Sequence, residues 1–171
     1  MSIAEPIKIG PWGGNGGTMF DVPNPPPARL DSMTIRAAGL IDSIGFSYVD
    51  EADNKRTAGP FGGTGGQLIT IQFAPKEWVT KLSGTIVEAS LSGGKPTVAS
   101  LEIETNIRKY GPYGTVNKDY SFSIPLPKGL IIAGFFGRAG RFIDAIGVYI
   151  GYKNEKLDAI TVATNDKTLG N

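Results

Sequence analysis

The chain has 171 residues and a net charge of +1, and it contains neither cysteine nor histidine. This composition excludes disulfides, Ser-His-Asp and Cys-His catalysis, and the usual zinc sites. Acidic and basic residues are interspersed, and no apolar run approaches the length of a membrane helix. We therefore expect no metal, no cofactor, no nucleic-acid partner and no membrane insertion.

Short segments rich in β-branched and aromatic residues recur along the chain, separated by Gly- and Pro-rich turns. The segment at residues 68–73 alternates with a period of two, as a half-buried strand does. The candidate strands are residues 32–36, 44–49, 68–73, 85–89, 99–105, 120–124, 130–136 and 146–150. No segment has the pattern of an amphipathic helix, so the sequence predicts an all-β sandwich, barrel or prism.

Two independent elements reveal an internal repeat. The block Gly-Pro-Trp-Gly-Gly-Asn-Gly-Gly at residues 10–17 returns as Gly-Pro-Phe-Gly-Gly-Thr-Gly-Gly at 59–66, and a degraded copy begins at Gly111. Likewise, Leu-Ile-Asp-Ser-Ile-Gly at residues 40–45 matches residues 142–147, and a copy midway has Ala99 in place of the aspartate. A unit of about fifty residues used three times predicts three sheets around a pseudo-three-fold axis.

The order of these elements predicts which loops meet. Asp42 is followed by the Gly-rich block that ends at Gly66, but no such block follows Asp144. Three-fold closure would supply the missing block from the start of the chain. We therefore expect Asp144 to lie beside Gly17 and Asp42 beside Gly66, whereas the third copy has lost its carboxylate.

The chain resembles jacalin-related lectins of the mannose-binding, banana-lectin-like type. The resemblance rests on the block at residues 10–17, on Gly-Phe-Phe-Gly-Arg-Ala-Gly at 134–140, and on Gly-x-x-x-Asp at 140–144. It implies a type I β-prism of three four-stranded antiparallel sheets. Residues 1–150 would form a single lectin domain, and residues 151–171 a C-terminal extension of unknown role.

The resemblance also implies a principal carbohydrate site. In it the carboxylate of Asp144 would accept hydrogen bonds from two sugar hydroxyls, and the main-chain N–H groups of Gly17, Arg141 and Phe142 would donate to sugar oxygens. An ionised carboxylate is a strong bidentate acceptor, and glycine allows close approach of a ligand to the backbone. We expect the side chain of Phe142 itself to belong to the core.

A second candidate site lies in the first repeat and comprises Gly66, Gly39, Leu40 and Asp42. Its leading residue is Ala38, where the motif has glycine. We expect the third copy to be inactive. Galactose-binding members of the family are cleaved before the residue that corresponds to Gly17; here the chain is continuous, which favours mannose or glucose.

Two rival functions remain open from the sequence. A glycosidase would need a second acid beside Asp42 or Asp144, and none is near either in the sequence. A protein–protein interaction or regulatory domain with a vestigial sugar site is the stronger alternative. Because the N-terminus has no signal-peptide pattern, we expect a cytoplasmic or nucleocytoplasmic protein. By analogy with the family, we expect a homodimer or homotetramer.

Overall fold

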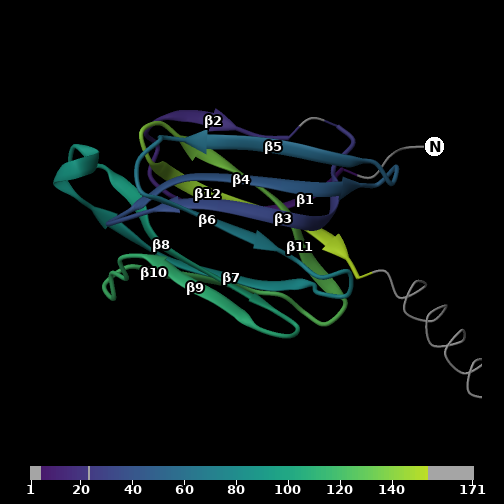
Figure 1. Cartoon of the computed structure of the whole chain (residues 1–171). Coiled ribbons are helices and arrows are strands. Elements are labelled where there is room, and N and C mark those ends of the chain that lie inside the picture. Colours follow the sequence, from purple (N-terminus) through teal and green to yellow (C-terminus); the bar gives the residue numbers. More distant parts are fainter. Residues whose placement is uncertain (1–4, 23, 154–171) are drawn as a thin grey trace, which may run out of the picture.

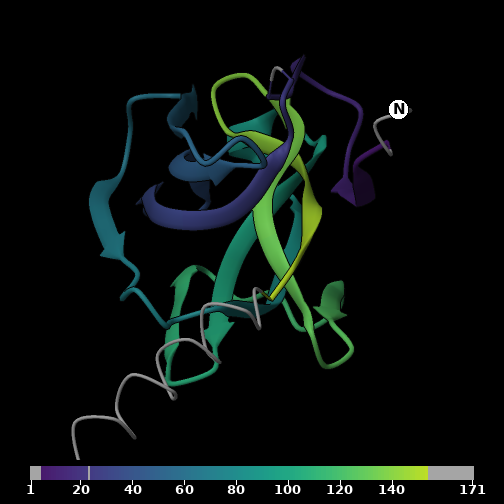
Figure 2. The same ribbon diagram turned by 90° about the vertical axis from the view of Figure 1, so that its right-hand side faces the viewer.

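The computed structural model describes residues 5–22 and 24–153, and it shows three four-stranded sheets packed around a common core. All strand pairs within the sheets are antiparallel. Most strands run along the long direction of the molecule (Figure 1), and Figure 2 shows the same ribbon from one end. The predicted β-prism is confirmed.

Each sheet corresponds to one repeat. The first has the order β1 (Ile7–Gly13), β12 (Ile143–Tyr152), β11 (Leu130–Ala139) and β2 (Thr18–Phe20). The second has the order β5 (Lys55–Gly62), β4 (Ile41–Asp50), β3 (Pro27–Ala37) and β6 (Gln67–Gln72). The third has the order β10 (Ser121–Pro125), β7 (Val79–Glu88), β8 (Pro96–Thr105) and β9 (Lys109–Gly114), with a 3-10 helix, η1 (Ser90–Ser92), between β7 and β8.

The first sheet joins the two ends of the domain. Strands β1 and β2 come from the start of the chain, and they flank β11 and β12 from its end. This is the closure that the sequence required to place a Gly-rich block beside Asp144. The core that all three sheets enclose contains side chains such as Ile35, Leu82 and Ile146, each fully buried.

The Gly-rich blocks are not simple turns, because each begins as the end of a strand. Strands β1, β5 and β9 do not appear among the predicted strands, and neither does β2. In all three blocks the Gly–Pro peptide bond is cis, and the pairing register shifts at this point. Proline is tolerated there because β1, β5 and β9 are edge strands and a bulge needs no continuous ladder of N–H donors.

Strand β12 continues to Tyr152, so it includes the first two residues of the predicted C-terminal extension. The β-like stretch at residues 159–163 lies outside the described residues. Within the described ranges, no helix has the length and apolar character needed to cross a membrane.

Candidate functional site

Asp144 lies at the start of β12, where its side chain is almost enclosed by the Gly-rich block of the first sheet. The residue is only 9% exposed. A Cβ atom at Gly17 would lie 2.5 Å from Oδ2 of Asp144, and one at Gly16 would lie 2.8 Å from Oδ1. Gly17 also has a φ of +66°, in the left-handed region that favours glycine. The predicted meeting of Asp144 and Gly17 is therefore confirmed.

Arg138, near the end of β11, holds this Gly-rich loop in place. Its Nε donates a hydrogen bond to the carbonyl oxygen of Gly16, and its Nη2 donates to that of Gly17, both at 2.9 Å. The main-chain N–H of Gly14 adds a hydrogen bond to the carbonyl oxygen of Asp144, also at 2.9 Å. Sequence reasoning gave Arg138 no role, although it lies in the quoted Gly-Phe-Phe-Gly-Arg stretch and an arginine recurs at the corresponding position of the first repeat, Arg36.

The turn between β11 and β12 supplies the remaining predicted residues. It is closed by a hydrogen bond of 3.0 Å from the N–H of Gly140 to the carbonyl oxygen of Phe142. The side chain of Phe142 is buried in a small cluster with Leu40 and Ala99, so its predicted place in the core is confirmed. Among the described residues, the N–H groups of Gly17, Arg141 and Phe142 donate to no protein acceptor. The turn and the Gly-rich loop beside Asp144 thus hold three main-chain donors that no described acceptor uses.

The second candidate site repeats this arrangement at the start of β4. A Cβ atom at Gly66 would lie 2.7 Å from Oδ2 of Asp42, which confirms the second predicted pairing. Ala38 donates to the carbonyl oxygen of Leu40 at 3.1 Å, as Gly140 does in the first site, so the loss of the leading glycine leaves the turn intact. Arg36 again reaches the Gly-rich loop, but its contacts are longer: Nη1 lies 3.3 Å from the carbonyl oxygen of Gly66.

Asp42 carries an unusual buried atom. The residue is 7% exposed, and its Oδ2 has no hydrogen-bond partner among the described residues. A buried carboxylate oxygen without a donor costs free energy that a protein normally avoids. Such an atom is ready to accept a hydrogen bond from a ligand hydroxyl.

The electrostatic surroundings of the two carboxylates are alike. Burial raises the pKa of Asp144 above its ordinary value, while Arg138 and Lys95 act in the opposite direction. Burial also raises the pKa of Asp42, opposed by Arg141 and Arg36. Among the described residues, the charged groups that shift the pKa of either carboxylate are all basic, whereas a glycosidase uses a second acid beside the first. No group of three acidic residues able to hold a metal occurs within the described ranges.

The third copy has lost this chemistry. Ala99 stands in place of the aspartate and is buried in the cluster with Leu40 and Phe142. Thr85 replaces the arginine, and its Oγ1 pairs with Oγ of Ser100 at 2.6 Å while accepting a bond from the N–H of Asn117. The side chains of Thr85 and Ser100 are therefore satisfied within the protein, as we expect of an inactive copy.

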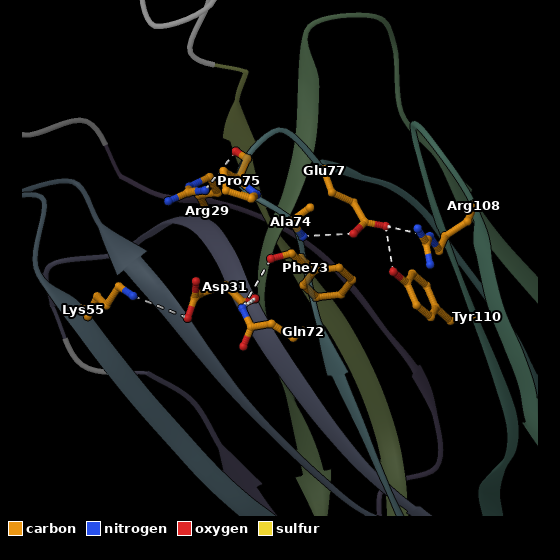
Figure 3. Close-up of a pocket in the computed structure, with 10 residues that line it drawn as sticks. All are labelled: Arg29, Asp31, Lys55, Gln72, Phe73, Ala74, Pro75, Glu77, Arg108 and Tyr110. Carbon is orange, nitrogen blue, oxygen red and sulfur yellow. Dashed lines mark hydrogen bonds and ion pairs between the residues drawn. The ribbon is translucent and has the colours of Figure 1, made fainter.

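A cavity of about 460 Å³ lies at the other end of the prism, lined by charged residues that Figure 3 shows as sticks. Its buried acid, Glu77, accepts hydrogen bonds from Oγ1 of Thr105 and the hydroxyl of Tyr110, both at 2.8 Å, and from the N–H of Ala74 at 3.0 Å. These bonds lower the pKa of Glu77 although its burial acts to raise it. Glu77 thus has its acceptors filled by protein donors, which indicates a structural role.

The two arginines allow a matched test of loop positioning. We expect Arg138→Gln to weaken sugar binding at Asp144 about tenfold, and to lower the free energy of unfolding by about 1–2 kcal/mol, because two well-formed hydrogen bonds are lost. Arg36→Gln should have a smaller effect at Asp42, since its hydrogen bonds are longer. Titration calorimetry and thermal denaturation measure both quantities. Equal effects of the two substitutions on their own sites would contradict this reading.

The fold and these loops define the class: a three-fold β-prism with paired Gly-rich and Gly-x-x-x-Asp loops at one end. Comparison with known families gives a match to the jacalin-like lectin domain over residues 9–149. The chain belongs to this family.

Individual relatives agree with the assignment. Horcolin of Hordeum vulgare is 43% identical over 149 residues, which cover 86% of this chain and 99% of horcolin. The structure of AcmJRL, a mannose-binding jacalin-related lectin from Ananas comosus, superposes with a TM-score of 0.79 at 37% identity, covering 86% of this chain and 99% of AcmJRL. Malaysian banana lectin gives a TM-score of 0.77 at 40% identity, covering 87% and 100%. The resemblance seen in the sequence is thus confirmed.

Proposed function

We propose that this chain is a lectin that binds mannose- or glucose-containing glycans without chemical change. At the principal site, the carboxylate of Asp144 accepts hydrogen bonds from two neighbouring hydroxyls of a pyranose. The main-chain N–H groups of Gly17, Arg141 and Phe142 donate to sugar oxygens. A sugar offers both donors and acceptors, and this combination of one ionised acceptor and several fixed donors complements it.

The observation that carries the proposal is the pair of nearly buried carboxylates at one end of the prism, Asp144 and Asp42, each packed against its own Gly-rich loop. Beside Asp144, the N–H groups of Gly17, Arg141 and Phe142 donate to no described residue, and the exposure of Gly17 and Arg141 leaves room for a ligand. At Asp42 the oxygen Oδ2 lacks any described partner. Buried polar groups are rarely left unpaired in a native fold unless a ligand or water completes them. The mannose binding named for AcmJRL supports the same ligand class.

The alternative, an interaction domain with a vestigial sugar site, is not favoured by this geometry. In the third copy, where the carboxylate is lost, protein donors and acceptors satisfy the loop's side chains. At Asp42 and Asp144 the buried carboxylate is kept, and Oδ2 of Asp42 has no partner among the described residues. A vestigial site would be expected to look like the third copy.

Titration calorimetry with methyl α-mannoside tests the proposal directly. We expect a dissociation constant near the millimolar range, since a monosaccharide in a shallow site makes few contacts. Sugar at a hundredfold excess over that constant should stabilise the fold by about 2.7 kcal/mol, visible as a higher melting temperature. Absence of both heat and thermal shift would exclude the lectin function and favour the interaction domain. Methyl α-galactoside serves as the control ligand.

Three properties extend this proposal. We propose a homodimer or homotetramer, because several sites on one particle would turn weak binding into useful avidity. The exposed edge strand β1, with Ile7 and Ile9 at its surface, supports this proposal. We also propose that one lectin domain, residues 1–150, carries the activity, with residues 151–171 as an extension. A cytoplasmic or nucleocytoplasmic location is consistent with a chain that has no cysteine for disulfides.

A further inference from the structure

The segment Arg141–Phe142 of the first site also lies against both loops of the second site. A Cβ atom at Gly63, in the Gly-rich loop beside Asp42, would lie only 2.2 Å from the carbonyl oxygen of Arg141. On the other side, Phe142 shares its buried cluster with Leu40, from the Asp loop of the second site. The two sites are therefore neighbours that share one wall.

The side chain of Arg141 is placed to act at this wall. Its guanidinium lies 5.3 Å from the centre of the Phe142 ring and, among the described residues, makes no hydrogen bond or ion pair. Burial raises the pKa of Asp42, and the positive charges of Arg141 and Arg36 act to lower it. A guanidinium carries five N–H donors. The main chain of Arg141 packs on the Gly-rich loop of the second site, whose carboxylate has the unpaired oxygen Oδ2.

The pseudo-three-fold symmetry provides an internal comparison. At the first site, Gly14 packs against the carbonyl oxygen of Pro96 as Gly63 packs against that of Arg141, and the adjacent Lys95 lowers the pKa of Asp144. Each carboxylate thus receives a cation from the next repeat. At the third copy, Gly39 stands at the position of Arg141 and Pro96, and Ala38 at that of Lys95; neither is charged, and the carboxylate is absent. Cation and carboxylate are kept together or lost together.

We propose that Arg141 serves both sugar sites, its main-chain N–H the site at Asp144 and its guanidinium the site at Asp42. This inference rests on the proposed lectin function. At the second site, one sugar hydroxyl donates to Oδ2 of Asp42 and accepts a hydrogen bond from the guanidinium of Arg141. The main-chain donors of that site are uncharged, so none of them could replace this cation. The ligand class is a neutral pyranose with adjacent hydroxyls, and the cation keeps the carboxylate ionised while it binds.

The test isolates each site in turn. Asp144→Ala leaves only the second site, and Asp42→Ala leaves only the first. Arg141→Gln is introduced into both backgrounds, with Arg141→Lys as the matched variant that keeps the charge. In titrations with methyl α-mannoside, we expect Arg141→Gln to weaken the second site about tenfold, and at least fivefold more than the first. Arg141→Gln should also raise the pH below which the second site no longer binds mannoside. Arg141→Lys, which keeps the charge, should return this pH to its wild-type value.

Three outcomes would overturn the inference: equal losses at both sites, an unchanged pH limit, or an Asp144→Ala protein that binds no mannoside while Asp42→Ala still binds. The proposed function fails separately, through a wild-type protein that binds no mannoside at either site. Because Arg141 is exposed, its substitution should leave the melting temperature unchanged, and this measurement shows that the variants are folded.

Discussion

Replacement of Asp144 by alanine is expected to abolish sugar binding at the principal site and to leave one weaker site. The carboxylate would make two charge-assisted hydrogen bonds to the sugar, each contributing about 1.5–3 kcal/mol. Their loss, at least about 3 kcal/mol, lowers the affinity more than a hundredfold. Titration calorimetry with methyl α-mannoside should show the stoichiometry falling from two sugars per chain to one.

Asp42→Ala provides the reciprocal measurement. Oδ2 of Asp42 has no described hydrogen-bond partner, so this substitution should remove the second site with little loss of fold stability. The double variant Asp144→Ala/Asp42→Ala should bind no mannoside, with a melting temperature that still shows a folded prism. Two sites retained in Asp144→Ala would show that the Gly-x-x-x-Asp loop is not where the sugar binds.

The pairing of distant loops was predictable because the sequence repeats itself. Asp144 and Gly17 are far apart in the chain, yet the absence of a Gly-rich block after Asp144 placed that block at the start of the chain. The structure confirms both pairings, Asp144 with Gly17 and Asp42 with Gly66. These loop pairings were accessible because three-fold closure leaves one Gly-rich block, the one at the start of the chain, for Asp144.

The edge strands were not predictable from local pattern. Strands β1, β5 and β9 contain the Gly-Pro-aromatic-Gly blocks, whose composition indicates turns by propensity alone. Their strand conformation comes from pairing with the central strands β12, β4 and β8, and the bulge that accommodates the proline is a property of that pairing. Tertiary context therefore overrides the local preference.

Contacts between repeats were equally unpredictable from the sequence. The bonds from Arg138 to the carbonyl oxygens of Gly16 and Gly17 join residues more than a hundred positions apart in the chain. The proximity of Lys95 to Asp144, and of Arg141 to Asp42, depends on how neighbouring sheets are rotated about the axis. A repeat defines which loops are equivalent, but it does not say which side chains reach from one repeat into the next.

Gly17→Ala should eliminate the principal site by a different route, because a methyl group at this position occupies the space of the carboxylate. The new Cβ would lie 2.5 Å from Oδ2 of Asp144 and 2.6 Å from the carbonyl carbon of Ala139, so the Gly-rich loop must move away from the start of β12 and the end of β11. The left-handed backbone adds about 1–2 kcal/mol of strain for any residue with a Cβ. We expect mannoside binding at Asp144 to be lost.

Gly93→Ala separates the two causes. Gly93 has a φ of +68°, nearly that of Gly17, but a Cβ there would meet no atom within 4 Å. It should therefore show the backbone strain alone, while Gly17→Ala should be less stable than Gly93→Ala by about 1–3 kcal/mol, the usual range for overpacking. Urea denaturation gives this difference, and calorimetry should show that Gly93→Ala still binds at Asp144. If Gly17→Ala bound mannoside as the wild type does, the tight packing of Gly17 on Asp144 would have no part in the sugar site, and Arg138 would be holding a loop that the ligand does not touch.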